Sequence, residues 1–328
     1  MKIAVLDDWQ GVARANADWD RLRARGEVVF FPQAFASDDE AVAKLAGFEI
    51  LLAMRERTHF TGALVRRLKG VRMIGTTSAR TLSLDMAACT EMGIVVTHTS
   101  SGPGTPATAE LALALMLNAM RGLAQADANM RAGRFQEGVP VGFACTGKTL
   151  GLVGIGRIGS LMARYGIALG MKVQAWSQNL TEEAARAAGA AKVDKDALMA
   201  TSDVISIHYV LSERSRGMIG AADIARMKRG AVLVNTSRGP IVDEAAMLAA
   251  LNAGRIKAGL DVYDREPLPA DHPLRRAPNT VLSPHLGYCV QEVWENFYPE
   301  HVENALAFLD GKPIRVSNPE VLGTRWPA

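Results

Sequence analysis

A short apolar run that ends in a glycine-rich turn constrains the fold of this 328-residue chain more than any other feature. The segment reads TLGLVGIGRIGSLMARYG at 149–166, and it spaces Gly154, Gly156 and Gly159 as G-x-G-x-x-G. The first glycine makes a tight turn, the second lets the backbone approach a pyrophosphate, and the third lets a helix pack closely on the strand. Because the motif lies between a strand pattern and a helix pattern, it predicts a dinucleotide-binding α/β domain.

Strand and helix patterns alternate along almost the whole chain. Before the glycine motif, strands are predicted at 2–7, 27–31, 48–53, 71–76 and 94–97, with helices near 38–46, 61–69 and 83–92. From the motif onward, six strands are predicted at 149–153, 171–176, 203–207, 231–235, 256–262 and 280–283, with helices near 157–169, 181–188, 195–200, 221–227 and 243–252. A Gly/Pro-rich hinge at 100–106 and one long helix at about 106–131 join the two parts, and a tail helix at about 290–310 follows.

Composition excludes several classes of protein. The net charge of +3 is too small, and too scattered, to favour nucleic acid as a partner. The most apolar run, 111–120, is well short of the roughly 20 residues that a membrane span requires. Cys89, Cys145 and Cys289 lie far apart, which favours reduced thiols over disulfides or a metal site and predicts a cytoplasmic protein.

One literal motif match is rejected. Residues 142–149, GFACTGKT, satisfy the P-loop pattern. A phosphate-binding P-loop follows a strand and opens a helix, whereas this segment leads into the strand predicted at 149–153. We therefore expect a connecting turn here.

Three successive predicted strands each deliver one polar side chain to the same edge of the sheet. Arg238 follows AVLVN, Glu266 follows IKAGLDVY, and His285 follows TVLSP. Ligands of open α/β sheets bind beyond this carboxyl edge, where the Gly154 turn would also hold a pyrophosphate. Taken singly, a solvated arginine, a turn glutamate and a buried histidine are the simpler interpretations. Together beside a dinucleotide loop, the three favour a shared function.

The chemistry of these three side chains is compatible with one reaction. An arginine fork binds a carboxylate through two hydrogen bonds. A histidine can give or take a hydroxyl proton, and a glutamate bonded to it would favour the imidazolium and fix the ring. With a nicotinamide, the set predicts reduction of a 2-oxo acid or oxidation of a 2-hydroxy acid.

Six segments of the chain resemble one known family. They are GLVGIGRIGS (151–160), NTSRGPIVDEAA (235–246), GLDVYDREPLP (259–269), SPHLGY (283–288), TAELALAL (108–115) and DVISIHYVLSERSRGMIG (203–220). Together they are similar to the D-2-hydroxyacid dehydrogenases. The resemblance implies an α/β fold with two doubly wound parallel-sheet domains. A Rossmann cofactor domain (101–287) would be inserted in a flavodoxin-like substrate domain (1–100 plus 288–328), and the protein would pair as a homodimer through its cofactor domains.

The resemblance also implies a role for each matching residue. Arg238 would bind the substrate carboxylate, His285 would be the acid/base, and Glu266 would be its partner. Asp261 would hold the nicotinamide carboxamide with Gly287 nearby. The remaining cofactor contacts would come from Thr108, Gly154, Gly156, Arg157, Ile158, Gly159, Ser177, Gln178, His208 and Thr236.

The chain departs from the family pattern at two places. The second cofactor-domain strand usually ends in an acid that binds the ribose hydroxyls, whereas here Ser177 and Gln178 follow that strand. Losing the carboxylate removes a repulsion against a 2′-phosphate, so either NAD or NADP is expected. The loop near residue 77 has fewer glycines than in relatives, yet the amides of Ser78 and Ala79 could still bind a carboxylate. Arg55 and Arg80 could add charge for an acidic substrate or face solvent.

An alternative function remains open at this stage. The same fold could serve as an NAD(P)-sensing binding or scaffold protein with little turnover. A complete Arg/Glu/His set argues for catalysis. The sequence does not distinguish among 2-oxo acid substrates such as glyoxylate, hydroxypyruvate or bulkier acids.

Overall fold

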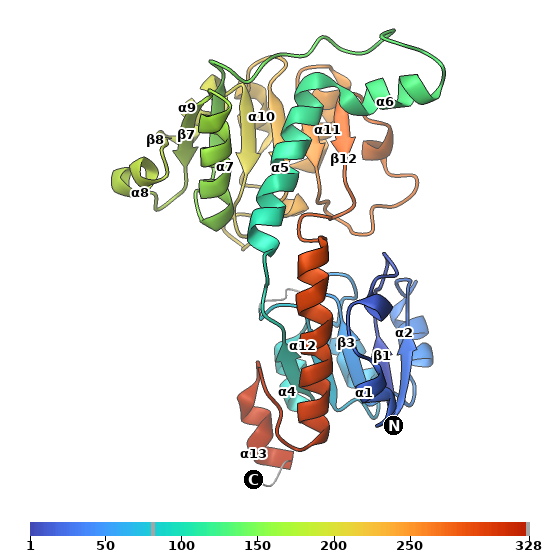
Figure 1. Cartoon of the computed structure of the whole chain (residues 1–328). Helices are drawn as coiled ribbons and strands as arrows, with labels where there is room; N and C mark the ends of the chain where they lie inside the picture. Colours follow the sequence, from blue (N-terminus) through green and yellow to red (C-terminus); the bar gives the residue numbers. More distant parts are fainter. Residues whose placement is uncertain (80–82, 326–328) are drawn as a thin grey trace. The chain divides into compact units, whose positions relative to one another are not determined.

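The computed structural model describes residues 1–79 and 83–325. The chain divides into two compact units, Met1–Pro103 with Val290–Ala328, and Gly104–Cys289 (Figure 1). Each unit is built on its own sheet, and both sheets are parallel throughout. The predicted α/β class is therefore confirmed.

The first unit contains five strands in the order β2-β1-β3-β4-β5. They are β1 (Lys2–Val5), β2 (Glu27–Phe30), β3 (Ile50–Ala53), β4 (Met73–Thr76) and β5 (Val95–His98). The helices are α1 (Asp20–Arg23), α2 (Asp38–Lys44), α3 (Gly62–Arg67), α4 (Met86–Glu91), α12 (Gln291–Leu309) and α13 (Leu322–Arg325), with 3₁₀ turns η1 (Ala13–Ala15) and η4 (Pro319–Val321). Helix α12, from the far end of the chain, packs against β4 and β5 and covers this part of the sheet.

The second unit contains seven strands in the order β12-β11-β10-β9-β6-β7-β8. They are β6 (Thr149–Val153), β7 (Lys172–Trp176), β8 (Ala191–Lys192), β9 (Val204–Ile207), β10 (Val232–Asn235), β11 (Lys257–Leu260) and β12 (Thr280–Leu282). The helices are α5 (Gly104–Arg121), α6 (Leu123–Arg131), α7 (Arg157–Ala168), α8 (Glu182–Ala187), α9 (Lys195–Thr201), α10 (Ala221–Arg226) and α11 (Glu244–Asn252), with η2 (Gly239–Ile241) and η3 (Pro273–Arg276). The strand order reverses between β6 and β9, which is where such sheets bind ligands.

Helices cover both faces of the second sheet, so its central strands are apolar on both sides. In β10, Val232 and Val234 face the core shared with Met162 of α7, whereas Leu233 faces the core shared with Leu251 of α11. Successive side chains of a strand point to opposite faces, so this continuous apolar run fills two cores. The burial fixes the register that brings the carboxyl ends of β6 and β9–β12 to one edge.

Two details differ from the sequence predictions. The single helix predicted at about 106–131 is wrong, because Gly122 adopts φ +67° and separates α5 from α6. That left-handed conformation interrupts a right-handed helix and is one that glycine adopts without strain. The six strands predicted from the glycine motif onward are also one too few, since the two-residue β8 pairs with β7. Residues 142–149 lead into β6 through a turn, as predicted.

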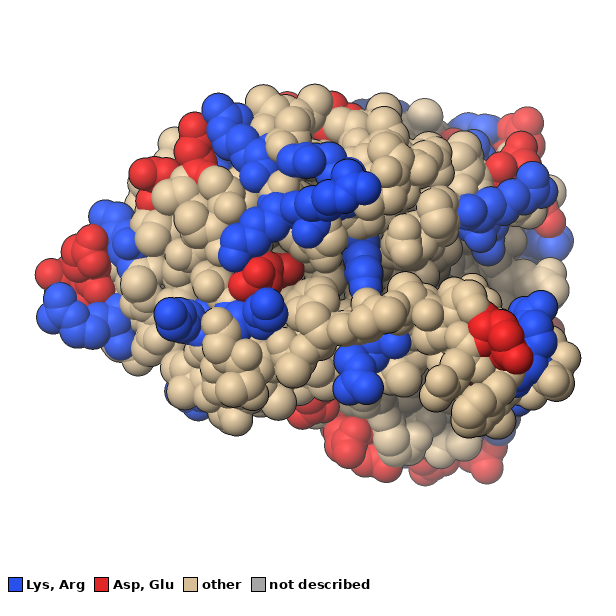
Figure 2. Space-filling view, turned by 90° about the horizontal axis from the view of Figure 1, so that it is seen from above, with Lys and Arg blue, Asp and Glu red and all other residues tan. Residues whose placement is uncertain are grey.

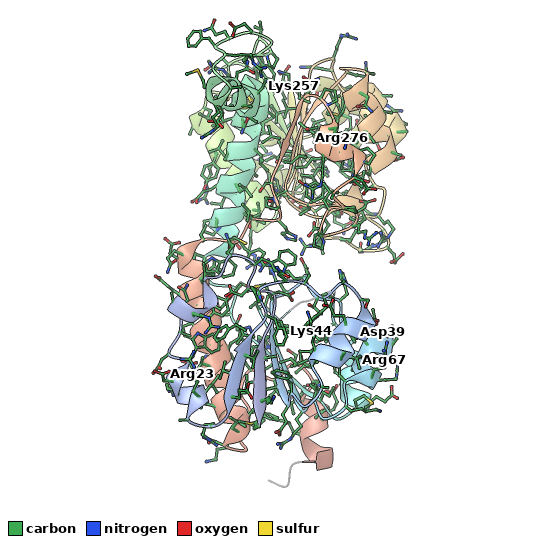
Figure 3. All side chains as sticks on the ribbon, turned by 90° about the vertical axis from the view of Figure 1, so that its right-hand side faces the viewer. Arg23, Asp39, Lys44, Arg67, Lys257 and Arg276 are labelled. Atoms are coloured by element: carbon green, nitrogen blue, oxygen red, sulfur yellow. The ribbon has the colours of Figure 1, made fainter. Side chains whose placement is uncertain are left out.

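Ion pairs between charged side chains occur in both units. In the first unit Arg67 pairs with Asp39 at 2.5 Å (Figure 3 labels both), and in the second unit Arg131 pairs with Asp127 at 2.7 Å. On the face seen in Figure 2, Lys and Arg side chains gather with few acids between them. Within the described part of the chain, no helix is long and apolar enough to cross a membrane.

Candidate active site

The glycine turn after β6 is held by contacts that admit no side chain at two positions. A Cβ on Gly154, where φ is +92°, would lie 2.4 Å from the carbonyl oxygen of His208. A Cβ on Gly159 would lie 2.2 Å from the carbonyl oxygen of Gly154. Gly156, which caps the start of α7, has no atom within 4 Å of its Cβ position. Gly154 and Gly159 therefore pack closely against backbone atoms, whereas the space next to Gly156 is open. There the N–H groups at the start of α7 attract a phosphate.

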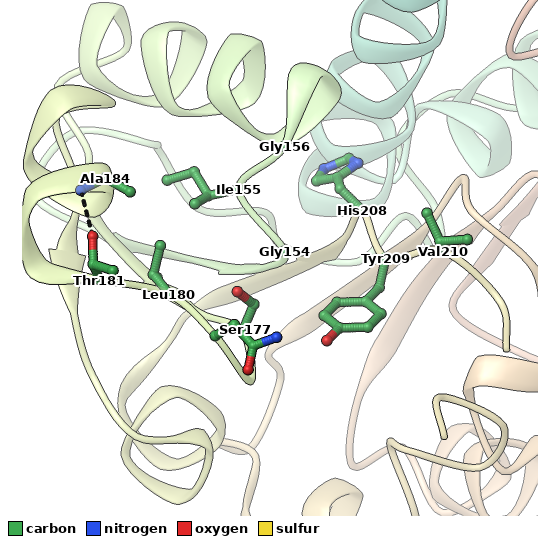
Figure 4. Close-up of a pocket in the computed structure, with 11 residues that line it drawn as sticks. Gly154, Ile155, Gly156, Ser177, Leu180, Thr181, Ala184, His208, Tyr209 and Val210 are labelled. Carbon is green, nitrogen blue, oxygen red and sulfur yellow. Dashed lines mark hydrogen bonds between the residues drawn. The ribbon is translucent and has the colours of Figure 1, made fainter. Parts of the chain in front are cut away.

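A pocket of about 410 Å³ opens beside this turn (Figure 4). It lies at the reversal point between β6 and β9, and its lining carries no Lys, Arg, Asp or Glu among the described residues. The lining residues are Gly154, Ile155, Gly156, Ser177, Asn179, Leu180, Thr181, Ala184, His208, Tyr209 and Val210. An uncharged pocket with both polar and apolar lining, beside the open space at Gly156, suits the adenosine half of a dinucleotide.

Sequence reasoning identified only part of this lining. Ser177 and His208 belong to it, whereas Gln178 does not. The pattern missed Asn179, Thr181 and Tyr209, whose places depend on how the loops after β7 and β9 fold. Tyr209 stacks against Trp176 at 6.5 Å between ring centroids, and its position directly after an apolar strand was the available signal.

Buried polar atoms at this edge lack a hydrogen-bond partner in the described part of the protein, among them His208 Nδ1 and the Thr236 hydroxyl. Burial lowers the pKa of the His208 ring to about 3 and keeps it neutral. Its Nε2 lies 2.9 Å from the Ser206 hydroxyl, while Nδ1 has no hydrogen-bond partner. The Thr236 hydroxyl is also without a partner. Because unsatisfied buried polar groups are costly, both atoms fit a site that a polar ligand completes.

Asp261 anchors the loop that follows β12. Its Oδ1 accepts a hydrogen bond from the Leu286 amide at 2.7 Å, and Oδ2 accepts one from the Gly287 amide at 2.9 Å. Burial raises the pKa of this carboxyl above its usual range. A Cβ on Gly287 would lie 3.1 Å from Cγ2 of Thr108 and 3.2 Å from Oδ2 of Asp261, so these three residues, predicted as cofactor contacts, are neighbours.

Glu266 and His285 form a direct pair. Oε2 of Glu266 lies 2.5 Å from Nδ1 of His285, and Oε1 accepts a hydrogen bond from the Tyr263 amide at 2.9 Å. His285 adopts φ +56°, and its amide donates to the Asp261 carbonyl at 2.9 Å. Both carboxylate oxygens of Glu266 therefore have a partner. His285 is held through its ring by Glu266 and through its backbone amide by Asp261.

Arg238 lies in the loop between β10 and η2, beside the loop that carries Glu266. Its Nη1 donates to the Ser237 carbonyl at 2.5 Å, and its own carbonyl accepts from the Asn235 amide group at 2.9 Å. The next residue, Gly239, packs so closely on the Tyr263 backbone that a Cβ would lie 2.1 Å from it. The structure thus brings Arg238, Glu266 and His285 to the carboxyl edge of one sheet.

The predicted substrate contacts of the first unit follow the carboxyl ends of β3 and β4. The Arg55 amide donates to the Thr77 hydroxyl at 3.0 Å, which ties the two loops together. Ser78 is buried with φ +93°, and Ala79 is exposed. Arg80 lies outside the described residues.

Comparison with known proteins identifies the family. The model of the D-isomer specific 2-hydroxyacid dehydrogenase NAD-binding domain matches residues 113–287. A glyoxylate reductase of Korarchaeum cryptofilum is 38% identical over 251 residues, which cover 75% of each chain. The chain belongs to the D-isomer specific 2-hydroxyacid dehydrogenase family. Membership places it among the oxidoreductases of 2-hydroxy acids and supports the use of NAD or NADP.

Two other members of this family show how far the similarity extends. A D-3-phosphoglycerate dehydrogenase of Archaeoglobus fulgidus is 35% identical over 280 residues, covering 85% of this chain and 53% of that enzyme. The chain therefore spans about half the length of that relative. The crystal structure of a phosphoglycerate oxidoreductase from Vibrio cholerae matches with a TM-score of 0.89 and 32% identity, covering 94% of this chain and 99% of that one.

Proposed function

We propose that this dehydrogenase interconverts a 2-oxo acid and a D-2-hydroxy acid with Arg238, Glu266 and His285 as its catalytic residues. The observation that carries the proposal is the 2.5 Å contact between Glu266 and His285 at the same sheet edge as the glycine turn. A nicotinamide cofactor held by the residues around the glycine turn would supply or accept the hydride.

In the reducing direction, the guanidinium of Arg238 binds the substrate carboxylate and polarises the C2 carbonyl. As the hydride reaches C2, the carbonyl oxygen takes a proton from Nε2 of His285, which leaves a neutral imidazole and a hydroxyl group. The carboxylate of Glu266 contacts Nδ1 and orients the ring for this transfer. Oxidation follows the reverse path, with Nε2 accepting the hydroxyl proton.

The cofactor is held mainly by the residues around the glycine turn. The N–H groups at the start of α7, from Arg157 to Gly159, would bind the pyrophosphate. Ser177 offers a hydroxyl that can bond either a ribose 2′-hydroxyl or a 2′-phosphate. Because the described lining of this pocket has neither a carboxylate nor a cation, we propose that both NAD and NADP bind and that neither is strongly selected.

The substrate's remaining contacts are proposed for the first unit. The amides of Ser78 and Ala79 would bind the carboxylate, and Arg55 would favour a substrate with a second acidic group. The Korarchaeum relative's name indicates glyoxylate, a 2-oxo acid, and the Archaeoglobus relative's name indicates a phosphorylated hydroxy acid. In both of these reactions the oxidised form of the substrate is a 2-oxo acid.

We also propose a homodimer formed through the cofactor unit. Large apolar side chains are exposed on α6 and the segment after it, including Phe135 (65%) and Val141 (96%), together with Leu123 and Met130. An apolar cluster of this kind marks a protein contact surface. Light scattering should give twice the chain mass, and a double variant with Phe135→Ser and Val141→Ser should give the monomer.

The catalytic assignment is tested with a matched pair of histidine variants. His285→Ala should lower kcat for NADH-dependent reduction of 2-oxo acids by about a thousandfold or more while NADH binding persists. His272→Ala is the control, because His272 also pairs with a glutamate, Glu244 at 3.1 Å. Near-normal turnover by His285→Ala would remove that residue from the mechanism. Tight cofactor binding without turnover of any 2-oxo acid by the wild type would favour the sensor function instead.

A further inference from the structure

The loop that follows β3 of the first unit is held from both neighbouring strands. In the sheet order β2-β1-β3-β4-β5, β3 lies between β1 and β4. On the β4 side, the Arg55 amide donates to the Thr77 hydroxyl at 3.0 Å. On the β1 side, the Thr58 amide donates to Oδ2 of Asp7 at 3.2 Å, and Nη1 of Arg57 donates to the Asp7 carbonyl at 2.5 Å. Asp7 is therefore the residue through which the β1 side holds residues 55–58.

Three residues other than glycine adopt a left-handed backbone at this edge of the sheet. The φ angle is +61° at Asp7 after β1, +60° at Glu56 after β3 and +93° at Ser78 after β4. His285, the proposed acid/base of the second unit, has a similar φ of +56°. Such conformations cost a non-glycine residue energy and cluster at functional sites. Asp7 thus shares its backbone conformation with residues that are proposed to serve the reaction.

The Asp7 carboxylate is buried at a cost to stability. The residue is 1% exposed, and Oδ1 has no hydrogen-bond partner in the described part of the protein. Burial raises the pKa of this carboxyl to about 6, against the opposing effects of hydrogen bonding to Thr58 and of the charges of Arg57 and His59. At pH 7.5 the group is therefore charged in surroundings that favour its neutral form. A costly group of this kind indicates a functional role.

The charge of Asp7 strengthens its contacts with the β3 loop. It attracts the guanidinium of Arg57, which is bonded to the Asp7 carbonyl and lies 4.6 Å from the ring centroid of Trp9. The Thr58 amide bonds the charged carboxylate, and such charge-assisted hydrogen bonds are about twice as strong as neutral ones. A neutral side chain of the same shape would keep the geometry and hold the loop less firmly.

We propose that Asp7 is a positioning residue for substrate binding, because its carboxylate and carbonyl hold residues 55–58 in the conformation that presents Arg55. Asp7 acts through this loop and not on the reacting atoms, so its effect falls on substrate affinity more than on the chemical step. The inference rests on the proposed function, which makes Arg55 a substrate contact.

Asp7→Asn tests the proposal, because the amide keeps the shape of the side chain and removes its charge. NADH-dependent reduction of glyoxylate, hydroxypyruvate and pyruvate is measured at pH 7.5, and the acid with the highest kcat/KM for the wild type is used. The variant should raise KM by about fivefold or more and change kcat by less than about twofold. Its urea midpoint should rise, since a buried charge is removed. A purely structural role would not give a more stable protein with weaker substrate binding.

The pH dependence of KM is a second measurement. At pH 5 the wild-type carboxyl is mainly protonated and is then neutral, like the amide of the variant. The ratio of the two KM values should therefore fall from about fivefold or more at pH 7.5 to less than about twofold at pH 5. Arg57 and His59, the charged and titratable groups that act on Asp7, are present in both proteins, as is His285.

Asp8→Asn is the matched control. Asp8 is also buried after β1, but its carboxylate accepts the amides of Val12 and Ala13 in its own loop. This variant should keep KM within about twofold of the wild type. An unchanged or lower KM in Asp7→Asn at pH 7.5 would refute the proposal, and so would an equal rise in Asp8→Asn. Absence of turnover by the wild type with every 2-oxo acid would contradict the proposed function, and this inference with it.

Discussion

Two glycines of the same turn should respond in opposite ways when each is replaced by alanine. At Gly159 the new Cβ would lie 2.2 Å from the Gly154 carbonyl oxygen, which is backbone and cannot rotate away. At Gly156 the new Cβ would meet nothing within 4 Å, and φ is −74°, which alanine adopts readily. Gly159→Ala should therefore damage the fold, and Gly156→Ala should damage only cofactor binding.

The magnitudes follow from these contacts. Overpacking at Gly159 costs about 1–3 kcal/mol, and the better helix propensity of alanine offsets about 1 kcal/mol of it, so a net loss of up to about 2 kcal/mol is expected. At Gly156, the poorer capping by alanine costs about 0.5–1 kcal/mol and the lower entropy of the unfolded chain offsets a similar amount. Losing one phosphate contact of about 1.5–3 kcal/mol would weaken NADH binding by about 10- to 100-fold.

The assay pairs urea unfolding with fluorescence titration of NADH. Gly220→Ala is the control, because Gly220 also caps a helix, and its nearest non-neighbouring atom would be 3.8 Å from the new Cβ. This variant should match Gly156→Ala in stability and the wild type in NADH affinity. Unchanged NADH affinity in Gly156→Ala would refute the proposal that this turn binds the cofactor phosphates.

Three further predictions test other parts of the chain. Ser177→Asp should weaken NADPH binding by about tenfold or more through repulsion of the 2′-phosphate and leave NADH binding intact, as measured by parallel titrations. Glu266→Gln should lower kcat by about tenfold or more with an unchanged Kd for NADH, because the amide does not reproduce the carboxylate contact that orients His285; an unchanged kcat would remove Glu266 from the mechanism. Burial raises the pKa of Asp7 from 3.8 to about 6, so its contribution to stability is present below pH 3.8 and is lost as pH rises through 6. Asp7→Asn should therefore stabilise the fold at pH 7.5, by about 3 kcal/mol at most, and give little gain at pH 4; equal urea midpoints for both proteins at pH 7.5 would contradict this.

The sequence predicted most of the sheet elements because a fully buried parallel strand is an uninterrupted apolar run. VLVN at 232–235 is such a run, and both of its faces are covered by helices. The break at Gly122 was missed because it lies in a long run of good helix formers, where one glycine is usually tolerated. The same limit applies to Asn179 and Tyr209, since loop residues face a pocket only through backbone angles that composition does not reveal.

The pairing of Glu266 with His285 was predictable, because β11 and β12 are neighbouring parallel strands and both residues follow their carboxyl ends. The sequence did not predict which residues hold His285 in place. The family resemblance assigned Asp261 to the cofactor, yet its two carboxylate oxygens accept the successive amides of Leu286 and Gly287 while its carbonyl accepts the His285 amide. Three bonds from one buried residue thus hold His285 at φ +56°, a conformation that costs a non-glycine residue energy. The approach of the imidazole to Glu266 therefore depends on Asp261 as well as on the two residues that meet, and replacing Asp261 would disturb the proton path even where the cofactor still binds.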